Sequence, residues 1–155
     1  MSTSLLASVL DPSLFVPDLR TRRKESVLGE MIARAHLAGA VRLPELLRET
    51  LVLRERAGST AVGKGVAVPH ARSLSVSEPH LVVARSRRGL AWTPGDPQPV
   101  TLVLLALSPA EVPAEGHLDF VARVVGATRL QRNRQKLLEA ESFDAVAAVL
   151  REVVA

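Results

Sequence analysis

Residues 58–72 read GSTAVGKGVAVPHAR, and at this stretch the pattern of the chain changes from helical to strand-like. Its three glycines allow backbone conformations and close approaches that residues with side chains resist. Pro69 favours an extended Val68, because the proline ring disfavours the helical region for the residue before it. We therefore expect His70 to follow a short buried strand, 66–68, from which its ring can be presented to a cleft on a rigid support. The alternative is a surface or core histidine that is packed for shape.

Helical periodicity occupies the outer thirds of the chain. Apolar residues at spacings of three and four predict helices over 21–38, with Thr21 as the N-cap, and over 43–56. The same spacing returns from about residue 115, where we expect two or three helices. Ser142 is a suitable N-cap for the last of them.

The middle third is rich in glycine and proline and predicts strands. Runs of valine and leucine favour strands at 66–68, 81–85 and 100–107, with 15–19 as a weaker candidate. Helices and strands do not alternate as they would in a doubly wound fold. We therefore expect an α/β (α+β) protein in which helices pack on a single mixed sheet, with residues 1–155 forming one domain.

Composition narrows the possible classes of protein. The 155 residues contain no cysteine, which excludes a disulfide framework, a thiolate nucleophile and cysteine-bound metal sites. No signal peptide is visible, and the apolar run 100–107 is far shorter than the roughly 20 residues of a membrane-spanning helix. We expect a soluble, cytoplasmic protein that does not insert into a membrane.

The positive charge does not indicate nucleic-acid binding. The net charge is only +4, with 17 arginines and 3 lysines. The four aromatic residues are not interleaved with basic runs, as binders of single strands require. Basic clusters at 20–24 and 129–136 are expected to be solvated helix faces or docking sites for an acidic partner.

In a chain without cysteine, histidine is the main candidate nucleophile, and His117 joins His70 as a candidate. Its place predicts the first turn of a helix, with the ring facing inward in line with Val121 and Val124. There the helix dipole disfavours the imidazolium, so a neutral ring could donate a hydrogen bond to a phosphoryl oxygen. The alternative is a histidine at the edge of the core that caps local backbone.

Arg54 is the third candidate. It lies three residues after Leu51 and seven after Leu47, so it continues the apolar stripe of its helix and is expected to point inward. An inward guanidinium must find an anion. The alternatives are a nearby carboxylate, or a buried stem with its charged end in water.

Four motifs carry a resemblance to a known family: LVLRE at 51–55, GST at 58–60, GxGVAVPHAR at 63–72 and HL at 117–118. Together they resemble the enzyme IIA domain of the fructose–mannitol type in the bacterial phosphoenolpyruvate phosphotransferase system. The chain is also similar to the nitrogen-regulatory branch of that family, and this branch is the closest in organisation. The resemblance extends from KE at 24–25 to AESFD at 140–144.

The resemblance implies a phosphocarrier whose roughly five-stranded mixed sheet has helices on both faces. It implies that His70 accepts a phosphoryl group from HPr or a nitrogen-branch relative of HPr. His117 and Arg54 would support that group, together with backbone N–H groups of the glycine-rich loop. No cofactor or metal ion is implied, and the protein would count as a transferase component that works by a phosphohistidine intermediate.

Three alternatives stay open at this point. The first is a fructose- or mannitol-type subunit that passes phosphate to a IIB domain. The second is a sensor or interaction module that controls a transporter or kinase, with phosphorylation as a switch or lost altogether. The third is a metal site formed by His70, His80, His117 and Asp119. Otherwise we interpret His36 and His80 as structural residues.

Overall fold

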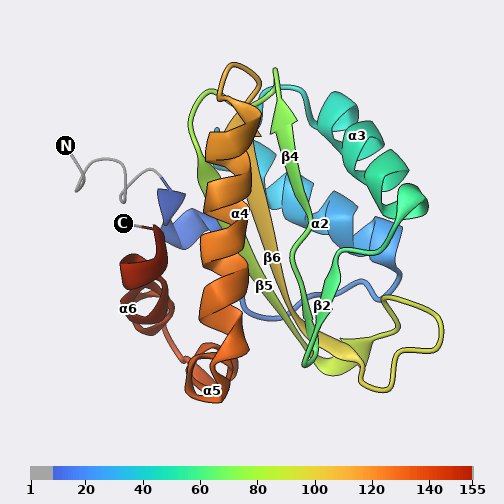
Figure 1. Cartoon of the computed structure of the whole chain (residues 1–155), viewed down its shortest axis with the longest axis vertical. Coiled ribbons are helices and arrows are strands. Elements are labelled where there is room, and N and C mark those ends of the chain that lie inside the picture. Colours follow the sequence, from blue (N-terminus) through green and yellow to red (C-terminus); the bar gives the residue numbers. More distant parts are fainter. Residues whose placement is uncertain (1–8, 155) are drawn as a thin grey trace.

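The computed structural model describes residues 9–154 and shows a mixed sheet with helices on both faces (Figure 1). A 3-10 turn, η1, spans Pro12–Leu14. The strands are β1 (Phe15–Val16), β2 (Ala61–Gly63), β3 (Val66–Ala67), β4 (His70–Ser73), β5 (His80–Leu90) and β6 (Val100–Pro109). The helices are α2 (Lys24–Leu37), α3 (Pro44–Ala57), α4 (Ala114–Arg129), α5 (Gln131–Glu139) and α6 (Phe143–Val154).

Strand β6 is the centre of the sheet. It pairs with β5 in antiparallel fashion on one edge. On its other edge β3 and β4 lie end to end, both parallel to it. Strand β1 is added outside β5 and β2 outside β3, so six strands fill about five positions. The expected mixed sheet of roughly five strands, with helices on both faces, is confirmed.

Alternation along β6 divides the core into two layers. Leu102, Leu104 and Ala106 belong to the apolar cluster formed with α4 and α6. Val103 and Leu105 belong to the cluster formed with α2 and α3. Successive side chains of a strand point to opposite faces, so a strand covered on both faces must be apolar throughout, and this explains the run at 100–107.

Several element ends differ from the sequence-based prediction. The first long helix begins at Lys24, because Thr21 is not an N-cap: its N–H and Oγ1 donate to Glu30 Oε1 at 3.0 and 2.7 Å. The strand expected at 15–19 ends at Val16. Ser142 Oγ does accept from the N–H of Ala145 at 3.3 Å, as a capping serine should.

Helix length sets one further limit on the described part of the chain. The longest helix, α4, has 16 residues. Within residues 9–154 no helix combines the length and apolar character needed to cross a bilayer.

Candidate functional site

His70 is the first residue of β4, where it lies opposite Ala106 of β6 on the face covered by α4. The strand expected at 66–68 ends at Ala67. The chain stays bonded to β6 at Pro69, because the Pro69 carbonyl accepts from the Ala106 N–H at 3.0 Å. The ring is half-buried, and its Nδ1 lies 2.9 Å from Val68 O. A carbonyl oxygen only accepts, so Nδ1 carries the proton and Nε2 of the neutral ring keeps its lone pair.

His117 comes to the same place from α4. Its ring centroid lies 5.5 Å from that of His70, and the side chain is buried. It faces inward with Val121 and Val124, as expected. Leu118 does not share this face, since it is 57% exposed. The two histidines singled out in the sequence therefore meet between β4 and α4.

The surroundings of His117 keep its ring neutral. Burial is the main cause that lowers its pKa from 6.5 to about 4, and repulsion from the protonated form of His70 and from Arg72 contributes to the same shift. Its Nδ1 lies 2.8 Å from Ser108 Oγ. Its Nε2 is buried and has no hydrogen-bond partner among residues 9–154. The described part of the site thus contains a neutral imidazole beside His70 with one unpaired polar atom, Nε2.

Arg72 belongs to this surface, although the sequence analysis assigned it no role beyond its place in a motif. It is two residues after His70, so both side chains leave β4 on the same face. Arg72 lies opposite Ser108 of β6, and its guanidinium donates to Val112 O at 2.9 Å. The spacing of two along a strand was the signal that could have identified it.

The prediction that Arg54 points inward is wrong. It is exposed at the end of α3 and donates to Gly58 O at 2.9 Å. The buried stripe of α3 continues through Leu47 and Leu51 to Glu55, at spacings of four, and therefore passes Arg54 by. Within residues 9–154 no hydrogen bond or ion pair joins Arg54 to His70 or His117.

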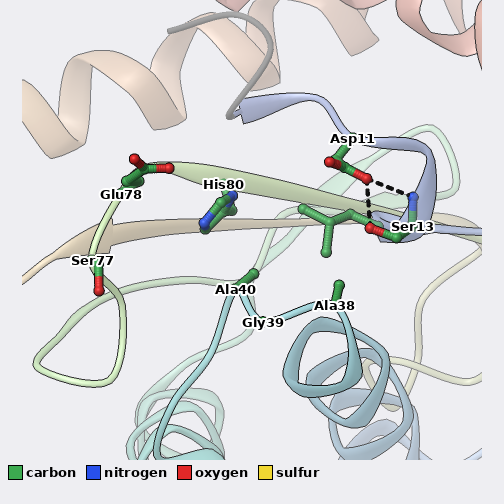
Figure 2. A pocket seen from close by; sticks show the side chains of 9 residues that line it. Asp11, Ser13, Ala38, Gly39, Ala40, Ser77, Glu78 and His80 are labelled. Carbon is green, nitrogen blue, oxygen red and sulfur yellow. Dashed lines mark hydrogen bonds between the residues drawn. The ribbon is translucent and has the colours of Figure 1, made fainter. Parts of the chain in front are cut away.

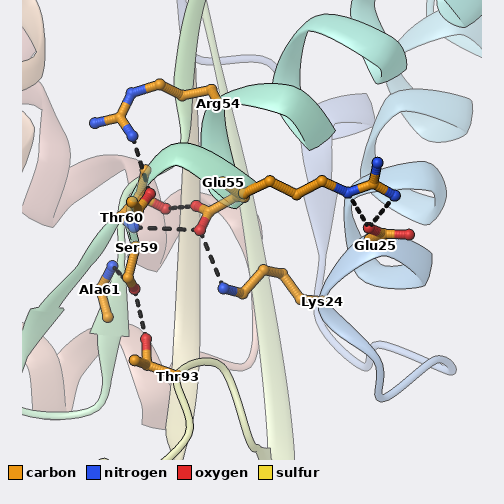
Figure 3. A network of polar contacts seen from close by, with 10 residues as sticks. Lys24, Glu25, Arg54, Glu55, Ser59, Thr60, Ala61 and Thr93 are labelled. Carbon is orange, nitrogen blue, oxygen red and sulfur yellow. Dashed lines mark hydrogen bonds and ion pairs between the residues drawn. The ribbon is translucent and has the colours of Figure 1, made fainter.

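Glu55 is a further residue that the sequence analysis missed, and it forms a buried network (Figure 3). Its carboxylate accepts from both the hydroxyl and the N–H of Thr60, the latter at 3.3 Å. Lys24 Nζ lies 3.2 Å from Glu55 Oε2 and 5.4 Å from the ring centroid of Trp92. Thr60 O accepts from the N–H of Val68 at 3.0 Å, so the network anchors the segment that leads to His70.

The glycines of the motif serve a turn and not the site. Gly63, Lys64 and Gly65 have φ values of 87°, 58° and 77° and connect β2 to β3. A Cβ at Gly65 would lie 3.2 Å from Pro99 O, which is closer than most Cβ contacts, so the backbone at Pro99 would have to shift to accept a side chain. His70 lies five residues further along an extended segment, roughly 16 Å away at 3.3 Å per residue. The glycine-rich turn is therefore not a source of N–H groups for His70.

His80 lies on the other face of the sheet. It pairs with Leu107, whose side chain belongs to the α2 and α3 core. It lines a cavity of about 290 Å³ together with Asp11 and Glu78 (Figure 2). His80 cannot complete a metal site with His70 and His117, and no cluster of three or more metal-binding side chains forms within residues 9–154. His36 Nδ1 lies 2.8 Å from Val41 O at the end of α2, in keeping with a structural role.

Comparison with known proteins shows to which family the chain belongs. The family model described as "Phosphoenolpyruvate-dependent sugar phosphotransferase system, EIIA 2" matches residues 8–153. The chain belongs to this EIIA family. Among solved structures, nitrogen regulatory protein IIA-Ntr from Neisseria meningitidis superposes with a TM-score of 0.80 at 27% identity, over 92% of this chain and 96% of that one.

Relatives of this EIIA domain carry two kinds of name. A nitrogen regulatory protein of Bradyrhizobium diazoefficiens is 33% identical over 94% of each chain. A fructose-specific EIIA component of Haloferax volcanii is 35% identical over 84% of each chain. The fructose-specific EIIABC component of Bacillus subtilis is 31% identical over 87% of this chain, which spans only 21% of that longer protein.

Proposed function

We propose that this EIIA domain carries a phosphoryl group on Nε2 of His70. The observation that supports it most is the arrangement of the two histidines. Val68 O holds the proton on Nδ1 of His70, so the lone pair lies on Nε2. The neighbouring His117 is neutral, and its buried Nε2 has no hydrogen-bond partner among the described residues, so it could bind an oxygen of the group.

In the proposed transfer, the lone pair of His70 Nε2 attacks phosphorus on the phosphohistidine of a donor protein. The N–P bond of the donor breaks, and its electron pair returns to the donor nitrogen. Because one imidazole replaces another, the step is nearly symmetric and needs in-line alignment and stabilisation of the equatorial oxygens above all. No step in it requires a metal ion.

The proposal divides this stabilisation among three side chains. His117 donates from Nε2–H to a phosphoryl oxygen, a contact that gains strength in a site with little water. Arg72 adds positive charge from the same face of β4. Arg54 moves its exposed guanidinium from Gly58 O to the phosphoryl group once a donor docks.

We propose that the donor is HPr or a nitrogen-branch relative of HPr, and that the role is regulatory. The match with the nitrogen regulatory protein of Bradyrhizobium diazoefficiens over 94% of both chains supports this branch. The second candidate is a fructose-type subunit that passes phosphate to a IIB domain, which the fructose-specific EIIA relative supports. A regulated transporter or kinase is the corresponding target in the regulatory role.

The test is phosphotransfer from phosphoenolpyruvate through enzyme I and HPr, with the modified atom located by mass spectrometry and phosphorus NMR. We expect one phosphoryl group, on Nε2 of His70, and none in His70→Ala. His80→Ala is the matched control and should be labelled fully, because His80 lies on the opposite face of the sheet. Full labelling of His70→Ala would refute the proposal, and onward transfer to an added IIB domain would favour the sugar-transport role.

A further inference from the structure

Ser108 lies beneath the histidine pair, near the end of β6. It is 2% exposed, and its hydroxyl oxygen lies 2.8 Å from Nδ1 of His117. Its place opposite Arg72 sets it on the face of the sheet that α4 covers. No other hydrogen-bond partner of the Ser108 hydroxyl is found in the described part of the chain. The direction of this one hydrogen bond therefore determines the positions of the Ser108 hydroxyl proton and the His117 ring proton.

Only one of the two possible directions of this hydrogen bond satisfies both groups. If Nδ1 of His117 carried the proton and donated it, the hydroxyl proton of the buried Ser108 would have no acceptor, which is costly. His117 Nε2 would then be a bare lone pair, and it would repel the oxygens of a phosphoryl group. If the Ser108 hydroxyl donates instead, Nδ1 accepts and the single proton of the neutral ring must lie on Nε2.

We propose that Ser108 is a positioning residue, which donates to Nδ1 of His117 and thereby keeps the His117 proton on Nε2, where a phosphoryl group on His70 can accept it. This inference rests on the proposed function of His70. The hydroxyl acts through His117 and does not touch the phosphoryl group. The hydrogen bond to a second residue therefore fixes the tautomer that the site uses, as it does for histidines that bind metals or act as bases.

Ser108 and His117 are both buried, so water cannot easily take over the hydrogen bond of the Ser108 hydroxyl. Nε2 of His117 is shielded from solvent as well, so water has no direct access to that atom in the structure. Removal of the hydroxyl leaves the ring with two nitrogens of nearly equal basicity and no group that selects between them. Both tautomers then become populated, and only one of them can donate toward His70.

The first measurement is the tautomer itself, read from the ring nitrogen signals of His117 in nitrogen-15 NMR at pH 7. We expect a protonated Nε2 in the wild-type protein and a mixture in Ser108→Ala. Ser108→Thr keeps the hydroxyl and should keep the wild-type tautomer. The control is Ser75→Ala, which removes another buried hydroxyl, one that bonds to Ser73 Oγ at 2.8 Å and does not contact His117.

The second measurement is the rate of phosphorylation of His70 in a double-mutant cycle. Ser108→Ala should slow transfer about twofold, because about half of the His117 rings then lack the proton on Nε2. In a His117→Ala background the same substitution should have no further effect, because its influence passes through the His117 ring. Ser75→Ala should leave the rate unchanged.

Each outcome separates the inference from the proposed function. A wild-type His117 with its proton on Nδ1, or an equal loss of rate from Ser108→Ala in both backgrounds, would overturn the role of Ser108. Absence of phosphate on His70 in the wild-type protein would instead overturn the proposed function. In that case the tautomer spectra still decide whether Ser108 holds the His117 proton.

Discussion

The two polar clusters on either side of the sheet differ in how completely they are paired. On the face of α2 and α3, the buried carboxylate of Glu55 has an ammonium ion from Lys24 and two hydrogen bonds from Thr60. On the face of α4, burial opposes the protonation of His117, and the positive charges of protonated His70 and of Arg72 oppose it too. Its Nε2 has no partner in the described part of the chain.

The difference favours the histidine cluster as the one suited to bind a ligand. A buried charge is tolerated when its partners lie within the protein, as for Glu55, and removal of one partner then destabilises the fold. A buried polar atom without a partner costs free energy in the free protein, and an incoming group can recover that cost. We therefore expect substitutions in the Glu55 network to lower the stability, and those at the histidine pair to lower the rate.

The largest expected effect is that of His117→Ala on the rate of phosphorylation. Loss of one preorganised donor to the transferred group should slow the reaction about 100- to 1,000-fold, by analogy with the loss of one oxyanion-hole donor. The measurement is rapid-quench phosphotransfer from HPr, with urea unfolding of the same variant alongside. His80→Ala, a substitution on the other face, should change neither the rate nor the site of labelling.

The comparison fails if His117→Ala keeps the wild-type rate and loses stability instead. The histidine would then be a packing residue like the members of the Glu55 network. A slow but stable variant would support the assignment of Nε2 as a donor to the phosphoryl group.

The pH dependence of stability should give the next largest effect. The folded-state pKa of His117 is about 4, below its ordinary value of 6.5. The unfolded chain therefore binds more protons in between, and the free energy of unfolding should fall by about 2–3 kcal/mol from this group as the pH drops from 7 to 4. Denaturation of the wild type and His117→Gln across this range isolates the contribution, since glutamine does not titrate.

Phosphorylation should shift the same pKa in the opposite direction. A dianionic group on His70 favours the imidazolium form of its neighbour, so the His117 pKa should rise. NMR titration of the phosphorylated and free protein measures the change. No rise would mean that the phosphoryl group does not lie against His117.

Much of the fold could be predicted because single patterns determine it. The change from helical to strand-like periodicity at 58–72 gave the three-part organisation, and the unbroken apolar run at 100–107 gave the central strand. The ends of elements were harder to predict. Thr21 looks like an N-cap, but its hydroxyl finds a better acceptor in Glu30, a partner that local sequence rules do not identify.

The site could be predicted in part, for a related reason. The histidine pair follows from two motifs and one helix face. The assignment of Arg54 to the inner face depended on a stripe read at spacings of three and seven, whereas the packing of α3 follows spacings of four and buries Glu55. Ser108 carried no signal, because a serine at the end of an apolar strand reveals its partner only when the fold is known.

Arg54→Ala tests whether an exposed arginine can serve the site. If its guanidinium moves to the phosphoryl group, removal of this charge-assisted contact should slow transfer roughly 10- to 150-fold. Arg56→Ala is the matched control, since that side chain lies on the same turn of α3 and pairs with Glu25 at 3.0 Å. An unchanged rate in Arg54→Ala would restrict Arg54 to its hydrogen bond with Gly58 O.

The smallest expected effect concerns the paired cluster. Glu55→Gln keeps an oxygen for Thr60 but leaves Lys24 without its counter-ion. Because Lys24 is 21% exposed and can reach water, we expect a loss of only about 1–2 kcal/mol in the free energy of unfolding. The same change at Glu25, whose pair with Arg56 is exposed, should cost less than about 1 kcal/mol. Urea denaturation measures both, and phosphotransfer rates within about threefold of wild type would keep the two clusters distinct.

If Glu55→Gln slowed transfer far more than it lowered stability, the network would have to act on His70 through Thr60 and Val68. The division between a paired structural cluster and an open functional one would then not hold.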